Sequence, residues 1–320
     1  MKDILVLLMA CCQFFVAHAQ LITKETLDII DEHNLYINDS TSTDLHYYQI
    51  LPEEGKPKGV IVVLPSGAER TEDTLKSITL HELAVDNSIM TIIPSINWGT
   101  DTMEAEIEFL DFIFKEVIKN HGVSKDKFIL GGLSNGGMIS LTYAEIAVKN
   151  PESTFLLPKG VFALDTPLDE THLYEYYERE IKRNFSEAGM LEAKYFLEEY
   201  NENYGGSPQD FPERYIEGSI YSHSEENGGN AEYLKDMPIR MYTDLDVEWL
   251  MNERHRDLYD WNGTDIVAMI NQLKILGNTD ANVKISQGKG VRLDGTRHPH
   301  SWSILDTEDC LKWIIDLFNN

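Results

Sequence analysis

Short apolar runs alternate with stretches of helical periodicity along most of this chain, and this alternation is its strongest constraint on fold. The run at 59–65 is continuous and bounded by turn residues, which is typical of a strand covered on both faces, and the run at 45–51 is rich in β-formers. The predicted strands cover residues 45–51, 59–65, 89–94, 127–130, 160–164, 239–243 and 282–286. Because helical patterns separate them, the sequence predicts an α/β fold with a doubly wound, mostly parallel sheet and helices on both faces.

The helical patterns differ in clarity, and the clearest spans 101–121. Its apolar residues recur at spacings of three and four, which is one face of an amphipathic helix, and Gly122 follows where such a helix would stop. The other predicted helices between or after the strands cover 71–87, 138–149, 253–276 and 307–318.

The regular alternation breaks between residues 169 and 236, which we call the cap segment. It is charged, rich in Tyr and Glu, and has helical stretches at 171–185 and 188–200 but no strand candidate. An insertion of this length between two strands of a regular sheet is more naturally a functional element than a loop. We expect a helical cap over the functional site, with a simple surface elaboration as the alternative.

The first 19 residues have the pattern of a secretory signal peptide. Lys2 precedes an apolar stretch that ends in a small-x-small pattern at residues 17–19. The apolar stretch is shorter than the roughly 20 residues of a membrane-spanning helix. We therefore expect a secreted or periplasmic protein cleaved after Ala19. Lipid anchoring at Cys11 is the alternative, because residues 8–11 resemble a lipoprotein processing site.

Cys310 is the one cysteine of the expected mature chain, because Cys11 and Cys12 lie in the expected signal peptide. We therefore expect no internal disulfide. About 300 residues are enough to bury a core without one. Since no stretch has the composition of a linker or repeat, residues 20–320 are predicted to form one domain.

The formal net charge of −27 predicts a strongly acidic surface. Such a surface repels nucleic acid and anionic membranes, and it favours neutral or positively charged small molecules. We expect no nucleic-acid partner and no stable membrane insertion of the mature chain.

Residues 132–136 read Gly-Leu-Ser-Asn-Gly and match the pattern G-x-S-x-G. The motif follows a predicted strand and opens a predicted helix, so Ser134 lies on a sharp strand-to-helix turn. The flanking glycines let neighbouring backbone approach closely, and the helix N-terminus places free N–H groups beside developing negative charge. Ser134 is the candidate nucleophile.

A serine hydroxyl needs an adjacent base and a group that orients that base. After a strand–serine–helix turn of this kind, the acid and then the histidine each follow a strand. Asp244 and Asp246 follow the penultimate predicted strand, and His298 and His300 follow the last one. Either acid and either histidine satisfies the required order.

Metal binding is the competing interpretation of the same residues. Asp244, Asp246 and Glu248 have the spacing of a calcium loop, but the sixth position of that loop lacks its glycine. His298 and His300 have no third zinc ligand at a persuasive spacing. We interpret the other histidines of the mature chain as structural or exposed: His33, His46, His81, His121, His172, His223 and His255.

An oxyanion hole needs two hydrogen-bond donors aimed at the tetrahedral oxygen. The backbone N–H of Asn135, the residue after the candidate nucleophile, is the first candidate. The loop after strand 59–65 supplies the second, from Gly67 or Ala68.

Taken together, the motif around Ser134, an acid after the penultimate strand and a histidine before the last helix resemble the α/β-hydrolase superfamily. The doubled glycine at 136–137 is similar to that of secreted esterases and prolyl-oligopeptidase-like serine hydrolases. The resemblance covers residue 45 to the C-terminus, apart from the cap segment. It implies the α/β-hydrolase fold with a helical cap insertion.

The resemblance also selects among the candidates. It favours Asp246, a few residues past its strand, over Asp244. It favours His300, directly before the closing helix, over His298. The implied mechanism is acyl transfer to Ser134 followed by hydrolysis, which needs no metal or organic cofactor.

The function that this resemblance implies is a secreted hydrolase of carboxylic esters, acting on a small or carbohydrate-linked ester. A serine peptidase of the prolyl-oligopeptidase-like kind is the alternative within the same chemistry, and a non-catalytic binding protein is the alternative outside it. The loop at 65–67 departs from the His-Gly patterns of common oxyanion loops, so the resemblance implies no lipase substrate class.

Overall fold

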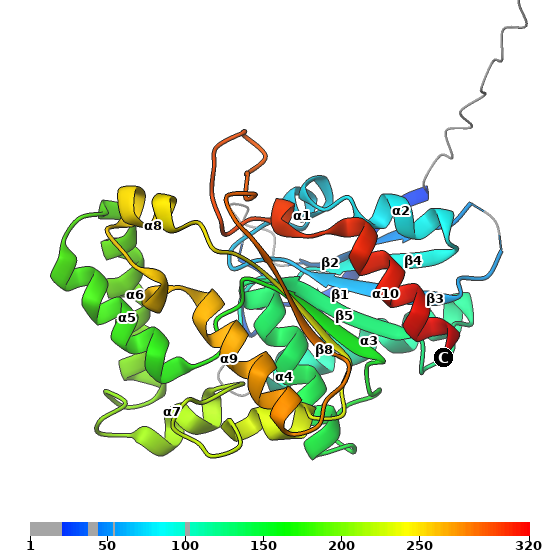
Figure 1. Cartoon of the computed structure of the whole chain (residues 1–320). Helices are drawn as coiled ribbons and strands as arrows, with labels where there is room; N and C mark the ends of the chain where they lie inside the picture. The colour runs from blue at the N-terminus through cyan, green and yellow to red at the C-terminus, as the bar shows by residue number, and fades with distance from the viewer. Residues whose placement is uncertain (1–20, 38–43, 54, 100–102) are drawn as a thin grey trace, which may run out of the picture.

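The computed structural model describes residues 21–37, 44–53, 55–99 and 103–320 (Figure 1). The expected signal peptide, residues 1–19, and the alternative processing site at Cys11 lie outside the described residues.

The described part of the chain contains an eight-stranded sheet in the order β1-β2-β4-β3-β5-β6-β7-β8. The strands are β1 (Leu21–Ile30), β2 (Asp44–Leu51), β3 (Gly59–Leu64), β4 (Ile89–Pro94), β5 (Phe128–Leu133), β6 (Gly160–Leu164), β7 (Ile239–Asp244) and β8 (Ala281–Ser286). β2 pairs antiparallel with β1 and β4, and the other pairs are parallel. The predicted doubly wound, mostly parallel sheet is confirmed.

Alternate residues of the central strands face two apolar cores. On one face, Val60 and Val62 of β3 pack in a core with α3 (Glu104–His121) and α4 (Asn135–Lys149). On the other face, Ile61 of β3 packs in a core with α2 (Leu80–Asp86) and α10 (Thr307–Asn319). The apolar runs are continuous because both faces are covered.

Strand β1 is absent from the sequence-based prediction. Its residues alternate between exposed and half-buried positions, and it lies at the edge of the sheet, where β2 is its one partner among the described strands. The segment has no continuous apolar run, so its strand conformation depends on hydrogen bonds to β2.

Two predicted helices are divided in the structure. Residues 71–87 form α1 (Thr71–Ser77) and α2, because Ile78 has an extended backbone and its buried side chain packs in the core. The region 253–276 contains the end of α8 (Val247–Arg254), a short 3-10 turn η2 (Leu258–Asp260) and then α9 (Asn262–Ile275). His255 ends α8 with a left-handed φ of 51°.

The cap segment contains α5 (Glu170–Arg183), α6 (Glu187–Asn203), α7 (Pro212–Gly218) and the 3-10 helix η1 (Gly229–Leu234). Helices α5 and α6 lie side by side at the left of Figure 1. Together with α7 they bury a cluster of their own that includes Tyr174 of α5, Tyr200 of α6 and Tyr215 of α7. Many of the tyrosines that made this segment unusual in the sequence therefore form its interior, whereas Tyr195 and Tyr233 are exposed.

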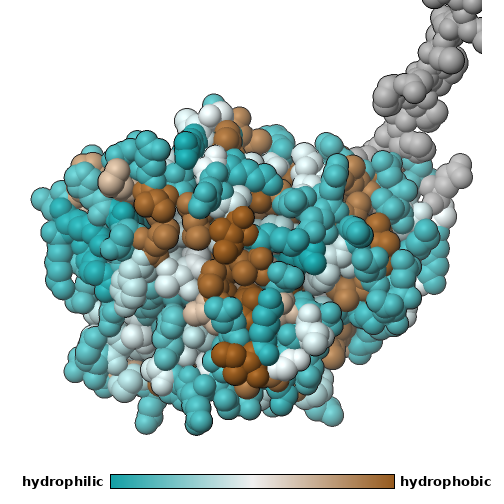
Figure 2. All heavy atoms as spheres, in the orientation of Figure 1, coloured by the Kyte–Doolittle hydropathy of each residue, from teal (hydrophilic) through white to brown (hydrophobic). Residues whose placement is uncertain are grey.

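Hydrophilic residues cover most of the face drawn in Figure 2, interrupted by an apolar strip. This distribution agrees with the formal net charge of −27. None of the helices in the described ranges is long and apolar enough to cross a bilayer.

Candidate active site

Ser134 occupies the turn between β5 and α4, at the C-terminal edge of the parallel strands. Its φ of 56° and ψ of −120° lie in a region that residues with side chains rarely adopt. The Ser134 N–H donates to the Leu164 carbonyl at 2.9 Å, which anchors the turn to the neighbouring strand β6. Strained backbone of this kind persists where surrounding structure enforces it, and it is found most often at functional sites.

The two glycines of the G-x-S-x-G motif permit this turn because their surroundings leave no room for a side chain. A Cβ on Gly136 would lie 2.2 Å from the Leu64 carbonyl oxygen. A Cβ on Gly132 would lie 2.4 Å from the backbone of Gly136. The motif therefore reflects close packing of α4 against β3 and β5.

His300 lies in the loop before α10, and its Nδ1 is 2.6 Å from Oδ2 of Asp165. Asp165 directly follows β6 and is 0% exposed. Thr243 donates a second hydrogen bond to this carboxylate, at 3.2 Å. Asn262 donates to the Asp165 carbonyl at 2.8 Å and fixes its backbone, which has a φ of 39°.

The burial of Asp165 affects its ionisation. Burial raises the pKa of the Asp165 carboxyl, and the hydrogen bond from His300 acts against that rise. A buried carboxylate bound to Nδ1 fixes the orientation of the imidazole and stabilises its positive charge if the ring takes up a proton.

The predicted pairing of Asp246 with His300 is wrong. One carboxylate oxygen of Asp246 caps α8 by accepting from the Trp249 N–H at 3.1 Å, and the other pairs with Arg297. The alternative, Asp244, is also engaged elsewhere: Ser286 Oγ and the backbone N–H groups of residues 289 and 290 donate to it. Both acids build the loops around the site, and Asp165 contacts the histidine.

His298 has a different environment from His300. Its Nδ1 accepts from the His300 backbone N–H at 3.2 Å, and its ring packs against Trp249 with centroids 4.5 Å apart. Burial lowers the pKa of His298 to about 3, so its ring is neutral near pH 7. His298 therefore supports the loop, whereas His300 lines the same cavity as Ser134.

The candidate oxyanion donors are only partly as expected. Asn135 is the first residue of α4, so its N–H has no partner within the helix. Gly67 lies beside it, since a Cβ on Gly67 would be 3.8 Å from the Asn135 Cβ, and both residues line the cavity. The N–H of Ala68 donates to the Asn97 carbonyl at 3.0 Å, so Ala68 is not available as a donor.

Glu69 is a supporting residue that sequence reasoning missed. Its half-buried carboxylate accepts from the Ser66 N–H at 3.1 Å, from Thr74 Oγ1 at 2.9 Å and from Trp302 Nε1 at 2.9 Å. It thereby joins the loop that carries Gly67 to the segment after His300. The sequence does not indicate this role, because Trp302 is 233 residues away from Glu69 in the chain.

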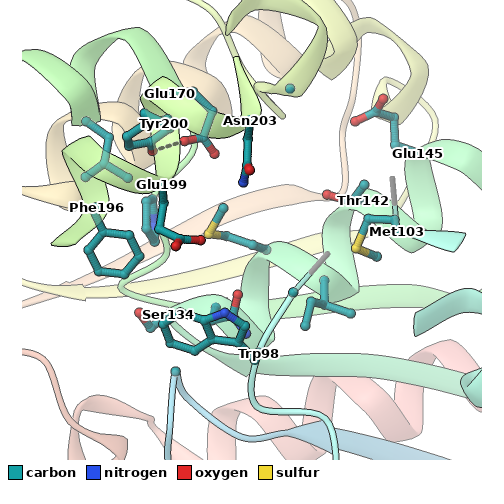
Figure 3. A pocket seen from close by; sticks show the side chains of 18 of the residues that line it. Trp98, Met103, Ser134, Thr142, Glu145, Glu170, Phe196, Glu199, Tyr200 and Asn203 are labelled. Carbon is teal, nitrogen blue, oxygen red and sulfur yellow. Dashed lines mark hydrogen bonds between the residues drawn. The ribbon is translucent and has the colours of Figure 1, made fainter. Parts of the chain in front are cut away.

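The cavity at Ser134 has a volume of about 1100 Å³ and lies between the sheet edge and the cap segment (Figure 3). Trp98 lies beside Ser134, and Phe196 stacks on Trp98 with ring centroids 6.1 Å apart. Glu199 and Tyr200 lie on the same side of the cavity as Phe196. Helices α5 and α6 therefore border the candidate nucleophile.

Acidic side chains dominate the charged part of the cavity lining. Its described lining contains seven glutamates, at 104, 108, 145, 170, 192, 199 and 217, against Lys149 and Arg292. Burial raises the pKa of Glu145 to about 8 and that of Glu170 to about 7. Glu145 and Glu170 are therefore partly or largely protonated near pH 7, and it is the remaining carboxylates of the lining that disfavour negatively charged groups in the cavity.

Comparisons with known proteins reveal likeness in structure and none in sequence. No protein-family model and no curated protein matches the sequence. A solved structure of fungal esterases from Rhizomucor miehei is 14% identical, with a TM-score of 0.53 over 94% of this chain and 85% of that one. The S-formylglutathione hydrolase of Agrobacterium tumefaciens is 12% identical, with a TM-score of 0.54 over 94% and 97%.

A larger protein also contains the same architecture. The acylaminoacyl peptidase of Pyrococcus horikoshii is 15% identical, with a TM-score of 0.52. The match covers 87% of this chain and 40% of that one. At such low identity these structures establish a shared fold, and the chemistry has to be argued from the site.

Proposed function

Because this chain has the α/β-hydrolase fold, we propose that it is a secreted serine hydrolase that cleaves carboxylic esters. One observation carries the proposal. Ser134, on a strained strand-to-helix turn, lines the same cavity as His300, whose Nδ1 is bound to a buried carboxylate. This is the set of groups that acyl transfer to serine requires.

In the proposed reaction, the Ser134 hydroxyl oxygen attacks the ester carbonyl carbon while His300 Nε2 takes the hydroxyl proton. The carbonyl oxygen becomes an oxyanion, which the N–H groups of Asn135 and Gly67 stabilise. When the C–O bond to the alcohol breaks, the alcohol oxygen takes the proton from His300. A water molecule then repeats the sequence on the acyl-enzyme, releasing the carboxylic acid and restoring Ser134.

The cavity supports a small ester whose groups are neutral or positively charged. Trp98 and Phe196 offer aromatic faces near Ser134, and the surrounding carboxylates offer hydrogen-bond acceptors and negative charge. These groups suit a hydroxyl-rich leaving group, as in a carbohydrate-linked ester, or an amine-bearing one. An anionic ester would meet like charge.

The alternative activities differ from this one in measurable ways. Purified protein is expected to hydrolyse a p-nitrophenyl ester with a kcat/KM at least about 100-fold above that for the p-nitroanilide of the same acyl group. Faster cleavage of the anilide would favour the peptidase alternative, to which the likeness to the acylaminoacyl peptidase draws attention. Hydrolysis of neither would favour a non-catalytic binding protein.

The charge preference is tested with matched esters that differ only in a terminal ammonium, methyl or carboxylate group. We expect kcat/KM for the anionic ester to be at least about tenfold lower than for the other two, a difference of about 1.4 kcal/mol. Glu199→Gln should reduce the ratio of kcat/KM for the neutral ester to kcat/KM for the anionic ester by about threefold, because it removes one partly screened negative charge. Glu226→Gln, an exposed position outside the cavity lining, should leave it unchanged. Equal rates for all three esters would contradict the proposed preference.

A further inference from the structure

We propose that His172, His223 and Asp265 form a Zn²⁺ site that fastens the cap segment to helix α9. One atom from each side chain can be chosen so that all three lie within 4.8 Å of one another. His172 is in the first turn of α5, His223 follows α7, and Asp265 is in the first turn of α9. None of the three lines the cavity at Ser134, so the ion would have a structural role.

The three side chains converge on one carboxylate oxygen. His172 Nδ1 lies 2.8 Å from Oδ1 of Asp265, and His223 Nε2 lies 2.9 Å from the same atom. The two rings therefore approach Asp265 from different parts of the cap segment.

A second acid holds both histidines in place. One oxygen of Asp169 accepts from the His172 backbone N–H at 3.1 Å, and the other accepts from the His223 backbone N–H at 2.8 Å. Tyr259 packs against the His172 ring with centroids 4.6 Å apart, and Tyr221 packs against the His223 ring at 4.9 Å. These contacts hold the backbone of both histidines and the orientation of their rings.

The donor set suits Zn²⁺, which binds imidazole nitrogen and carboxylate oxygen at about 2.0 to 2.2 Å. Tetrahedral ligands at that distance lie about 3.3 Å apart. The distances from Asp265 Oδ1 to His172 Nδ1 and to His223 Nε2 are slightly shorter than this. The 4.8 Å within which all three ligand atoms lie is longer. Small rotations of the two rings would bring all three ligands into range.

Burial and access also fit a bound ion. The side chain of Asp265 is 6% exposed and that of His172 is 9% exposed, whereas that of His223 is 44% exposed. Solvent therefore reaches the site from the side of His223, where water can supply the fourth ligand.

The experiment uses the full mature chain, first dialysed against a chelator and then against Zn²⁺. We expect one Zn²⁺ per chain by elemental analysis. Zn²⁺ at 100 times its Kd should raise the Tm by about 5 °C, and chelator should reverse the rise. Asp265→Asn and His223→Gln should abolish both effects. His33→Gln, at an exposed histidine away from the site, should retain both.

The readout is the change in Tm caused by Zn²⁺, because Asp265→Asn also removes hydrogen bonds and can lower the Tm without metal. The half-exposed His223→Gln gives a second variant with a smaller structural cost. A wild-type chain that binds no stoichiometric Zn²⁺, or variants that keep the Zn²⁺-dependent rise in Tm, would overturn the proposal and leave a hydrogen-bonded His-Asp-His cluster. The result does not depend on the proposed esterase activity, which chelator should leave unchanged below the Tm.

Discussion

Asparagine in place of Asp165 is expected to lower kcat for ester hydrolysis by about 10⁴-fold. The carboxylate is fully buried and bound to His300 Nδ1 at 2.6 Å, so it fixes the ring and offsets the positive charge that the ring gains during the reaction. Asparagine has nearly the same shape, so the fold should survive. It lacks the negative charge, and its amide allows the wrong tautomer of the histidine.

The matched control is Asp246→Asn, because Asp246 also follows a strand at this sheet edge but contacts Arg297 and the start of α8. Its kcat should stay within about tenfold of wild type, because asparagine caps a helix as well as aspartate does. A loss of up to about 1 kcal/mol in the free energy of unfolding is expected from the weakened pair with Arg297. Steady-state kinetics on a p-nitrophenyl ester and urea unfolding measure both quantities. The reverse pattern, with Asp246→Asn inactive and Asp165→Asn active, would restore the pairing expected from the sequence.

Alanine in place of His300 is expected to lower kcat by about 10⁴- to 10⁶-fold, because Ser134 then has no base to accept its proton. His298→Ala is the control, since it removes a neutral ring that supports the same loop. We expect a loss of about tenfold from looser positioning of His300. Single-turnover measurements separate acylation from later steps. Loss of acylation in His298→Ala with retention in His300→Ala would make His298 the base.

Much of the fold follows from the sequence because the chemical pattern is local. Continuous apolar runs predict the buried strands, and the G-x-S-x-G motif between a strand and a helix predicts the turn at Ser134. Strand β1 was missed because its polar alternation carries no such signal, and its conformation depends on pairing with β2. The expected cleavage after Ala19 and the export that it implies remain predictions.

The acid that contacts His300 could not be chosen correctly from sequence patterns. Asp165, Asp244 and Asp246 all stand at the ends of strands, and only their three-dimensional partners distinguish them. β6 lies directly beside β5 in the sheet, which brings the end of β6 next to the serine turn. The partners of Asp244 are backbone N–H groups more than forty residues later, at 289 and 290, which no local pattern reveals. The sequence does place Asp165 directly after a predicted apolar strand, which makes it a candidate of the same kind as Asp244 and Asp246.

The oxyanion loop and the proposed metal site also depend on contacts that local sequence patterns do not reveal. Ala68 was excluded by one backbone hydrogen bond to Asn97, and Glu69 joins the segment after His300 through its contact with Trp302, which is distant in the sequence. His172 and His223 have no ligand spacing in the sequence, because Asp265 joins them only after the cap segment has folded.

Covalent labelling by a fluorophosphonate is the most direct test of Ser134 as the nucleophile. An activated serine displaces fluoride from phosphorus, so the folded wild-type protein should gain one phosphonyl group, located on the peptide that contains Ser134. Ser134→Ala with an unchanged circular dichroism spectrum should gain none. Labelling of Ser134→Ala at the wild-type rate, or a folded wild-type protein that resists the probe, would contradict the proposal.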